Sequence, residues 1–260
     1  DATTGRRVAV KVIHAVSDRI HRSFERERAV MARLSAHPNV VTLYDSGYTP
    51  DGRPYLSMEL MDEGTLADRV GRQGPLPWRV AVNLLLPIAG ALDFAHRQKV
   101  LHRDVKPENI LLAGDQVRLT DFGIASLRDA SGYTTTRVAA SWGYTAPETL
   151  ENQRDERSDL YSLGSTLYML LTGEPPFAGQ GNASIQSLMY RLVNQPPPRL
   201  PADLAPPALD DILQACLAKD PDQRCQTADD FALELEAAAR AGADPNAGLP
   251  APPTRAVPPM

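Results

Sequence analysis

The residues from His102 to Asn109, with the sequence H-R-D-V-K-P-E-N, and the triplet Asp121-Phe122-Gly123 constrain the fold more than any other part of the chain. Between them lie two short apolar runs, Ile110 to Leu112 and Val117 to Leu119, which the turn-forming pair Gly114-Asp115 separates. Apolar runs on either side of such a pair are typical of a β-hairpin. The segment therefore predicts a polar loop, a hairpin and a second polar loop.

The expected hairpin brings two flanking polar residues together. With Asp115 at the centre of the turn, antiparallel pairing places position 109 opposite position 121, with Cβ atoms about 5 Å apart. Asn109 and Asp121 then face one another. An amide oxygen beside a carboxylate suits a hard cation such as Mg²⁺, which takes oxygen ligands and keeps others from water and phosphate. The spacing predicts a phosphate-bound metal.

A strand and a helix near the start of the chain supply a candidate charge pair. Val8 to Lys11 has the pattern of a buried strand that ends in a cation. From Asp18 to Ser35 the chain has helical periodicity, and Glu27 lies on the apolar face whereas Glu25 points about 100° away. Because a carboxylate among apolar groups is costly unless it is paired, we expect Glu27 to pair with Lys11. A solvated lysine is the alternative interpretation.

These motifs, in this order, resemble those of protein kinases, and the Lys106-Pro107-Glu108 segment resembles the serine/threonine branch in its bacterial, Hanks-type form. The resemblance runs from residue 1 to about residue 240. It implies an α+β, two-lobed protein-kinase-like fold, with a small, truncated, β-rich N-lobe that holds one helix and a mainly α-helical C-lobe. We expect the N-lobe at 1–61, the C-lobe at 62–243 and a proline-rich disordered linker at 244–260.

The resemblance assigns catalytic roles to the polar residues of the two loops. Asp104 would accept the proton of the substrate hydroxyl, and Lys106 would lie near the transferred phosphoryl group. Asn109 and Asp121 would bind Mg²⁺ or Mn²⁺. Ser141 stands where the family has a threonine, and its hydroxyl would bridge the base and the lysine of the loop.

Other residues would bind ATP. Lys11 and Glu27 would position its α- and β-phosphates. The predicted strand from Tyr55 to Met61, followed by Asp62-Glu63-Gly64, resembles the hinge between the lobes. The candidate contacts with the adenine ring are Ala9, Met58 as the gatekeeper, Glu59, Met61 and Leu111. Ordinary core packing is the alternative interpretation of the apolar members of this set.

The resemblance also implies a glycine-rich G-x-G-x-x-G strand-turn-strand before the lysine strand, which forms a lid over the phosphates. The sequence before that strand reads Asp1-Ala2-Thr3-Thr4-Gly5-Arg6-Arg7 and does not contain the motif. Phosphoryl transfer depends mainly on positioning and electrostatic stabilisation. We therefore expect weaker nucleotide binding and slower chemistry without the lid.

The stretch from residue 121 to residue 148 holds a candidate regulatory segment. Thr134, Thr135 and Thr136 lie in polar, glycine-containing sequence, and phosphorylation there would add nearly two negative charges. Arg103, next to the candidate base, would receive them, as in kinases that order this segment by autophosphorylation. An ordinary flexible Ser/Thr loop is the alternative interpretation.

Further residues are expected to support the scaffold. By the resemblance, Arg224 pairs with Glu148 of the Ala-Pro-Glu motif. Asp159 would accept hydrogen bonds from backbone amides of the catalytic loop, and a simple carboxylate at a helix N-terminus is the alternative. The helix expected from Trp78 to Arg97 contains Pro87, which removes a backbone donor and should bend it.

Charge and composition narrow the partners and the location. A net charge of -5 and the lack of a basic stripe with interleaved aromatic residues give no case for nucleic-acid binding. Cys216 and Cys225 have neither metal-ligand spacing nor a disulfide framework, which favours a reducing compartment. No apolar run reaches the length of a membrane span. We expect a cytoplasmic location. The resemblance is also compatible with a parent protein that is anchored in the membrane through a segment after the linker.

Three functional classes compete. The first is an ATP-dependent protein serine/threonine kinase that acts on Ser/Thr hydroxyls of proteins. It would be activated by phosphorylation of its activation segment, and a homodimer would carry out this autophosphorylation in trans. The second is a pseudokinase that acts as a binding or allosteric scaffold, which the missing lid and Ala140, in place of the family's glycine, favour. The third is a small-molecule phosphotransferase. The Ala146-Pro147-Glu148 motif argues against it, because small substrates need no peptide-docking platform.

Overall fold

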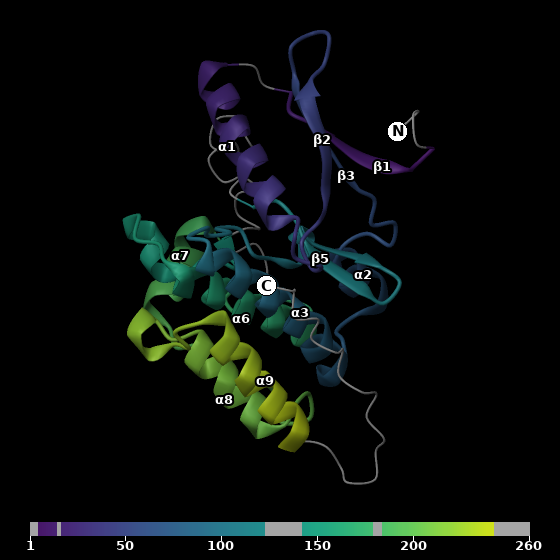
Figure 1. The fold of residues 1–260 in the computed structure, drawn as a ribbon. Coiled ribbons are helices and arrows are strands. Elements are labelled where there is room, and N and C mark those ends of the chain that lie inside the picture. The colour runs from purple at the N-terminus through teal and green to yellow at the C-terminus, as the bar shows by residue number, and fades with distance from the viewer. Residues whose placement is uncertain (1–4, 15–16, 123–141, 179–183, 242–260) are drawn as a thin grey trace.

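Two lobes of different composition make up the structure (Figure 1). The computed structural model describes residues 5–14, 17–122, 142–178 and 184–241. A three-stranded antiparallel sheet and one long helix form the small lobe, and helices dominate the large lobe. The expected α+β, two-lobed fold is therefore confirmed. A lobe boundary at residue 61 stays a prediction, and the expected linker lies outside the described residues.

The elements follow one another in a simple order. Those of the small lobe are β1 (Val8–Val12), α1 (Asp18–Leu34), β2 (Leu43–Tyr48) and β3 (Pro54–Glu59). Those of the large lobe are α2 (Leu66–Gln73), α3 (Trp78–Arg97), η1 (Pro107–Asn109), β4 (Ile110–Ala113), β5 (Gln116–Leu119), η2 (Pro147–Glu151), α6 (Glu156–Thr172), α7 (Ile185–Asn194), α8 (Pro207–Cys216), η3 (Pro221–Gln223) and α9 (Ala228–Ala241). The elements marked η are short 3₁₀ turns.

The sheet of the small lobe presents its lysine on an edge strand. Its strand order is β1-β3-β2, with both outer strands antiparallel to β3. In this register Lys11 of β1 lies opposite Leu56 of β3, and Ala9 lies opposite Met58. The predicted lysine strand is therefore present.

Helix α1 begins and faces inward as its periodicity predicts. Ser17 caps it, because its Oγ accepts a hydrogen bond from the Ile20 amide at 3.3 Å. Glu27 is 5% exposed, whereas Glu25 lies toward solvent and pairs with Arg28. The buried apolar residues of the helix are Ile20, Phe24, Met31 and Leu34. The inward carboxylate of this helix is therefore that of Glu27.

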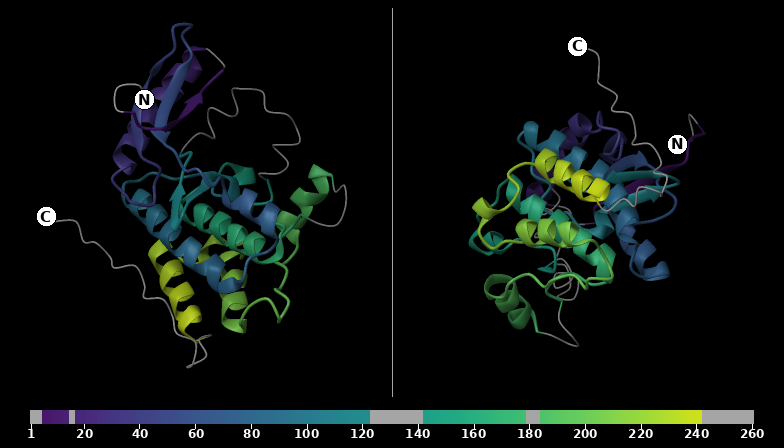
Figure 2. Two further views of the ribbon diagram at one scale, coloured as in Figure 1. Left: turned by 90° about the vertical axis from the view of Figure 1, so that its right-hand side faces the viewer. Right: turned by 90° about the horizontal axis from the view of Figure 1, so that it is seen from below.

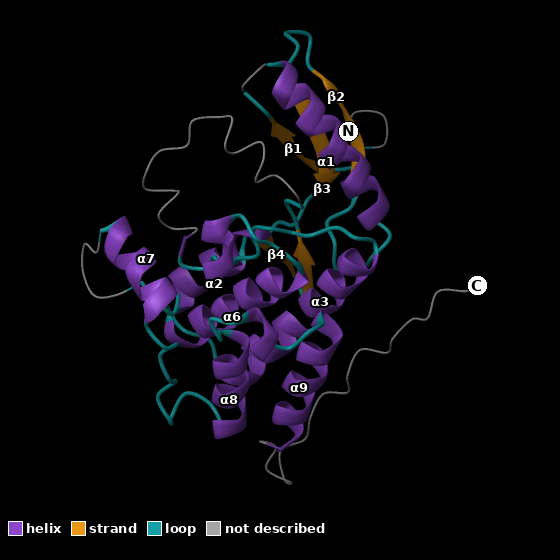
Figure 3. Ribbon diagram, turned by 90° about the vertical axis from the view of Figure 1, so that its left-hand side faces the viewer, coloured by secondary structure: helices purple, strands orange, loops and turns teal. Residues whose placement is uncertain are grey.

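Helix α3 lies at the centre of the large lobe, between α6 and α9 (Figures 2 and 3). By length and composition it could cross a membrane, contrary to the expectation that no apolar run is long enough. Its apolar side is buried in the large lobe, where Leu85, Ile88 and Leu92 have no exposed surface. The helix continues through Pro87. Its hydrophobic composition is thus accounted for by core packing.

The hairpin of β4 and β5 forms where the sequence predicts it, but its register differs by one residue. The strands are joined by the two-residue turn Gly114-Asp115, so the centre of the hairpin lies between these residues and not on Asp115. Gly114 has φ of +57°, which glycine adopts without strain and which suits a two-residue hairpin turn. The amide of Thr120 donates to the carbonyl of Asn109 at 3.0 Å. Asn109 therefore lies opposite Thr120, and its expected pairing with Asp121 is wrong.

A close contact between α6 and α8 makes a test of the core possible. A Cβ at Gly164 would lie 2.8 Å from Cys216 Sγ and 3.1 Å from Cys216 Cβ. We expect Gly164→Ala to lower the free energy of unfolding by about 1–3 kcal/mol, because the added methyl forces the two helices apart. Urea unfolding measures this change.

Gly71 of α2 provides the matched control, because nothing lies within 4 Å of a Cβ placed there. Gly71→Ala should be neutral or should raise the free energy of unfolding by up to about 1 kcal/mol, since alanine is the better helix former. Equal effects of the two substitutions would contradict the proposed overpacking.

Candidate active site

The loop that carries the candidate base is fixed by Asp159 of α6. Its carboxylate accepts hydrogen bonds from the backbone amides of His102 and Arg103, each at 2.8 Å. A third bond comes from His96 Nε2 of α3, also at 2.8 Å. The N-cap of α6 is Asp155, one turn earlier. Asp159 is therefore the acceptor for the loop amides, as the sequence resemblance implies.

Asp159 keeps its charge although it is 2% exposed. Burial by itself would raise the pKa of this carboxyl, but the hydrogen bond and charge of His96 and the hydrogen bond from the Arg103 amide hold the pKa below its ordinary value of 3.8. Arg103 has φ of +70°, a conformation that is uncommon for a residue with a side chain. The carboxylate thus stabilises a strained turn at the centre of the loop.

His102 joins the loop to the hairpin. Its Nδ1 accepts a hydrogen bond from the Asp104 amide at 3.2 Å, and its Nε2 lies 2.8 Å from the carbonyl oxygen of Thr120. These contacts fit the neutral imidazole with its proton on Nε2. The ring is buried and packs edge-on against Phe122, with 4.6 Å between the ring centroids. The loop before the hairpin and the segment after it therefore meet on one side chain.

Asp104, Lys106 and Asn109 form a cluster within this loop. Lys106 Nζ lies 3.1 Å from Asp104 Oδ1. Asn109 Nδ2 donates to Asp104 Oδ2 at 2.9 Å and to the Asp104 carbonyl oxygen at 2.6 Å. The Asp104 side chain is 15% exposed. One cation and one amide thus hold the carboxylate in a fixed orientation while part of it stays accessible.

Lys11 of the small lobe reaches Asp121 of the large lobe. Lys11 Nζ lies 2.8 Å from Asp121 Oδ1, and the two side chains are 32% and 17% exposed. Asp121 has φ of +67°, so the chain turns sharply just after β5. Among the ion pairs of the described residues, the expected pair of Lys11 with Glu27 does not occur. The ammonium is a compact point charge, and it pairs with the carboxylate of the loop that follows β5.

The residues at this end of the hairpin fit a divalent metal ion. Asp121 directly follows Thr120, which is bonded to Asn109, so the two predicted ligands lie at the same end of the hairpin. Both hydrogen bonds of the Asn109 amide given above use its nitrogen, which leaves its oxygen for a ligand. Among the described residues, no group of three His, Cys, Asp or Glu side chains could hold a metal. An amide oxygen and one carboxylate suit an ion that takes its other ligands from phosphate and water.

The candidate adenine contacts lie on both lobes. Met58, near the end of β3, is 8% exposed, and Met61, just after β3, is 7% exposed. Leu111 lies in β4 and forms an isolated β-bridge with Thr65. Glu59 donates its amide to the Thr42 carbonyl oxygen, and its carboxylate pairs with Arg118 at 2.6 Å. The predicted hinge contact at Glu59 is therefore limited to its carbonyl oxygen, and the nucleotide roles of these residues stay predictions.

Four predicted site residues lie outside the described residues. They are Ser141, Thr134, Thr135 and Thr136. Arg103, which is predicted to receive a phosphate from the threonines, is described, and its side chain is exposed. The regulatory role of this set stays a prediction.

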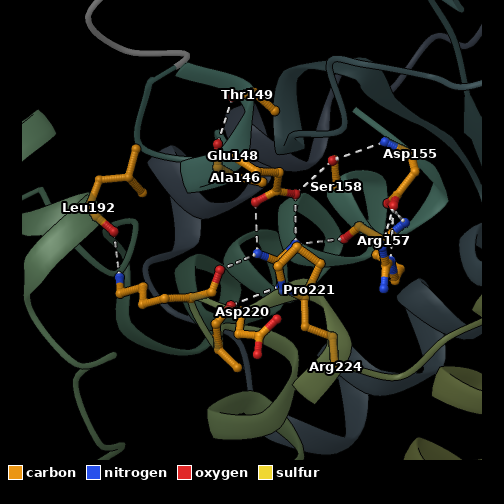
Figure 4. A network of polar contacts seen from close by, with 12 residues as sticks. Ala146, Glu148, Thr149, Asp155, Arg157, Ser158, Leu192, Asp220, Pro221 and Arg224 are labelled. Atoms are coloured by element: carbon orange, nitrogen blue, oxygen red, sulfur yellow. Dashed lines mark hydrogen bonds and ion pairs between the residues drawn. The ribbon is translucent and has the colours of Figure 1, made fainter. Parts of the chain in front are cut away.

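Glu148 and Arg224 form the predicted buried ion pair (Figure 4). Two parallel bonds, Nη1 to Oε1 and Nη2 to Oε2, are each 2.8 Å long, and the Arg224 side chain has no exposed surface. Ser158 Oγ also donates to Glu148 Oε1 at 2.7 Å. Burial would raise the pKa of Glu148, but the hydrogen bonds from Arg224 and Ser158 lower it below 4.5. The pair fixes η2 to the start of α6 and to the chain after η3.

The other donors of Arg224 are also used. Its Nε donates to the carbonyl oxygen of Ala218 at 2.8 Å, and its Nη1 and Nη2 donate to those of Arg157 and Lys219, each at 3.2 Å. All five N–H groups of the guanidinium therefore have acceptors. The side chain also stacks on Tyr161, with its central carbon 4.9 Å from the ring centroid.

His96 is the functional residue that the sequence interpretation missed. It lies on α3 with 6% of its surface exposed and binds Asp159. The one available signal was its position on the buried stripe of α3, four residues after Leu92 and seven after Ala89. A polar residue on such a stripe indicates a buried partner, but the sequence does not say which.

Comparison with known proteins agrees with this geometry. The protein kinase domain family matches residues 1–233. The serine/threonine-protein kinase PknB of Mycolicibacterium smegmatis is 40% identical over 246 residues, which cover 90% of this chain and 39% of that protein. The serine/threonine-protein kinase PknK of Mycobacterium tuberculosis is 39% identical over a match that covers 88% of this chain and 21% of PknK. The serine/threonine-protein kinase PknL of the same species is 38% identical over a match that covers 97% of this chain and 64% of PknL. The chain thus spans less than two thirds of each of these relatives.

The ion pair of Glu148 and Arg224 yields a stability prediction. Glu148→Gln leaves a buried guanidinium without its counter-charge, and we expect it to lower the free energy of unfolding by about 3 kcal/mol. Glu151→Gln, at an exposed residue of the same 3₁₀ turn, should change it by less than about 0.5 kcal/mol. Urea unfolding compares the two variants, and losses of the same size in both would contradict the role given to the pair.

The lowered pKa of Asp159 predicts the sign of a pH effect. Its contribution to stability is present above the ordinary pKa of 3.8 and is lost as the pH falls through the lower pKa of the folded state. Asp159→Asn should therefore lower stability at pH 5 to 7 and flatten the fall of stability below pH 4. Asp203→Asn, at an exposed carboxylate, is the control. The free energy of unfolding is measured between about pH 2.5 and 7 for each variant. If Asp159→Asn shows the same decrease of this free energy with falling pH as the wild type, the prediction is refuted.

Proposed function

The chain belongs to the protein kinase family, and we propose that it acts as an ATP-dependent serine/threonine kinase that transfers the γ-phosphoryl group to hydroxyls of protein substrates. The observation that carries the proposal is the cluster of Asp104, Lys106 and Asn109 on a loop that Asp159 holds in place. The relatives are named as serine/threonine kinases, which favours catalysis over the pseudokinase alternative.

Asp104 would act as the base in this proposal. One of its carboxylate oxygens contacts Lys106 and the other accepts from Asn109, so the group is oriented before a substrate arrives. An acceptor hydroxyl at its exposed edge would give up its proton to this carboxylate as the oxygen bonds to the γ-phosphorus. The bond from that phosphorus to the β-γ bridging oxygen breaks, and ADP leaves. The chain's contribution is mainly positioning.

Lys106 and Lys11 supply positive charge on two sides of the transferred group. Lys106 is 9% exposed as a side chain, so its ammonium acts in a medium that screens charge poorly. Lys11 comes from the small lobe and meets Asp121, which places its charge beside the predicted metal ligand. Both cations can stabilise charge on phosphate oxygens during transfer.

Kinases of this family use ATP with a divalent metal ion, and we propose Mg²⁺ here. Asn109, through its amide oxygen, and Asp121 are the residues that would hold it. When bound, the ion neutralises charge on the phosphates. The carboxylate that pairs with Lys11 would thus also hold the metal ion of the nucleotide from the side of the large lobe.

Regulation by phosphorylation of Thr134, Thr135 or Thr136, autophosphorylation in a homodimer and a cytoplasmic location belong to the same proposal. Arg103 supports the first of these, because its side chain is exposed and it directly precedes Asp104 on a loop whose backbone Asp159 fixes. Protein substrates are favoured over small molecules because the segment from Ala146 to Glu148 is fixed to the large lobe by Arg224.

Replacement of the base tests the proposal. Asp104→Asn should lower phosphoryl transfer from radiolabelled ATP to a general protein substrate by about 10²- to 10⁴-fold, because the hydroxyl loses its proton acceptor. Nucleotide binding, measured by titration with Mg²⁺ present, should change little. Asp115→Asn, in the exposed turn of the hairpin, is the matched control and should keep full activity.

The assay is repeated on a chain with a glycine-rich strand-turn-strand added ahead of residue 1, because a lid is expected to raise both binding and rate. Transfer that is equal in the wild type and in Asp104→Asn would contradict the proposed base. A lack of transfer in both backgrounds would refute kinase activity.

A further inference from the structure

A pocket lies beside the candidate base, between the catalytic loop and the start of α6. The residues of its wall that matter here are Arg103, Asp104, Thr149, Arg154, Asp155 and Ser158. Thr149, Asp155 and Ser158 can be followed in Figure 4. The pocket therefore adjoins the candidate base, and the proposed reaction gives no role to Thr149, Arg154 or Ser158 of its wall.

The carboxylates of this pocket, those of Asp104, Asp155 and Asp159, already have hydrogen-bond or charge partners within the chain. Asp104 and Asp159 are held by the contacts described above. Asp155 accepts from the Arg157 amide at 2.8 Å and pairs with the Arg157 guanidinium, with 2.6 Å between Nη2 and Oδ2. These interactions hold the pKa of Asp155 below its usual value, although burial acts in the opposite direction. The acids of the pocket thus already have hydrogen-bond or charge partners that belong to the fold.

The two arginines of the pocket are not neutralised in this way. The side chains of Arg103 and Arg154 are exposed, and neither makes an ion pair with another residue in the part of the chain that the structure describes. Arg103 is fixed through its backbone by Asp159, and Arg154 directly precedes Asp155, the cap of α6. Among the described residues, therefore, no ion pair compensates the positive charge that these two arginines bring to the pocket beside Asp104.

We propose that this pocket binds an anionic side chain of the protein substrate, a carboxylate or a phosphate, and that Arg154 determines the preference. The inference rests on the proposed kinase function. A guanidinium presents two parallel donors that match carboxylate and phosphate oxygens. Because Asp104 lines the same pocket, the bound side chain belongs to a residue a few positions from the acceptor. The substrate class is a Ser/Thr segment with a nearby acidic or phosphorylated residue.

Arg154 separates this inference from the regulatory prediction. Arg103 is the residue predicted to receive a phosphate from the chain's own threonines, so its replacement would affect both. Arg154 has no role in the proposed chemistry or regulation. Its exposed side chain also makes no bond that folding needs among the described residues, so its replacement should leave the unfolding transition unchanged.

The test measures binding of labelled peptides by fluorescence anisotropy. Each peptide has one Ser acceptor in a neutral background and carries Ala, Asp or phosphoserine at one of three positions on either side. We expect one position at which Asp or phosphoserine tightens binding about fivefold over Ala. Arg154→Gln should abolish this preference. Arg22→Gln, at an exposed arginine of α1 far along the chain, is the matched control and should retain it.

Charge reversal provides the second arm. Arg154→Glu should disfavour Asp and favour Lys at the same peptide position, and added salt should weaken both preferences. The Asp and phosphoserine peptides distinguish an acidic from a phosphorylated substrate. No preference in the wild type, or an unchanged preference in Arg154→Gln, would overturn the inference.

The binding readout needs no turnover, so it separates the two proposals. If peptides show the Arg154-dependent preference but no phosphoryl transfer occurs, the kinase function fails and the anion pocket stands. If transfer depends on Asp104 but no anionic position is preferred, the pocket inference alone fails.

Discussion

A single buried carboxylate, that of Asp159, determines the shape of the loop on which the candidate site is built. Removing a charge from water is unfavourable unless several bonds compensate it, and here two consecutive amides and an imidazole do so. The bonds are directed, so they also select the unusual backbone conformation of Arg103. The rest of the site follows from that turn, because it sets the direction in which Asp104 and Lys106 leave the loop.

The site is assembled from three separate parts of the chain. The loop before the hairpin brings the base, the segment after the hairpin brings Asp121, and the edge strand of the small lobe brings Lys11. His102 joins the first two through Thr120 and Phe122. The contact of Lys11 with Asp121 joins the lobes at a position where both side chains keep some exposure. Movement of one lobe relative to the other would therefore change the charge around Asp121 directly.

Patterns with a local physical cause could be predicted from the sequence. The lysine strand, the inward face of α1 and the hairpin follow from periodicity and turn chemistry, and the family resemblance supplied the roles of Asp159 and Arg224. The predicted register of the β4-β5 hairpin was wrong by one residue, because it assumed that the turn is centred on Asp115. The turn has two residues, Gly114 and Asp115, so its centre lies between them. The partner of Lys11 was wrong because periodicity identifies a buried carboxylate but not how far it lies from a strand that is distant in sequence. His96 was missed for the same reason, since its partner is 63 residues away.

The saturated guanidinium of Arg224 has a consequence for the irregular backbone around it. Carbonyl groups in a helix or sheet find donors within that element, but those of Ala218 and Lys219 lie in a loop after α8. Arg224 supplies their donors from a side chain, so this half-buried loop can pack against the large lobe without regular secondary structure. A lysine would preserve the charge but has three donors on one nitrogen, which cannot reach a carboxylate and three separate carbonyls together. The identity of this residue is thus required by the path of the main chain as much as by Glu148.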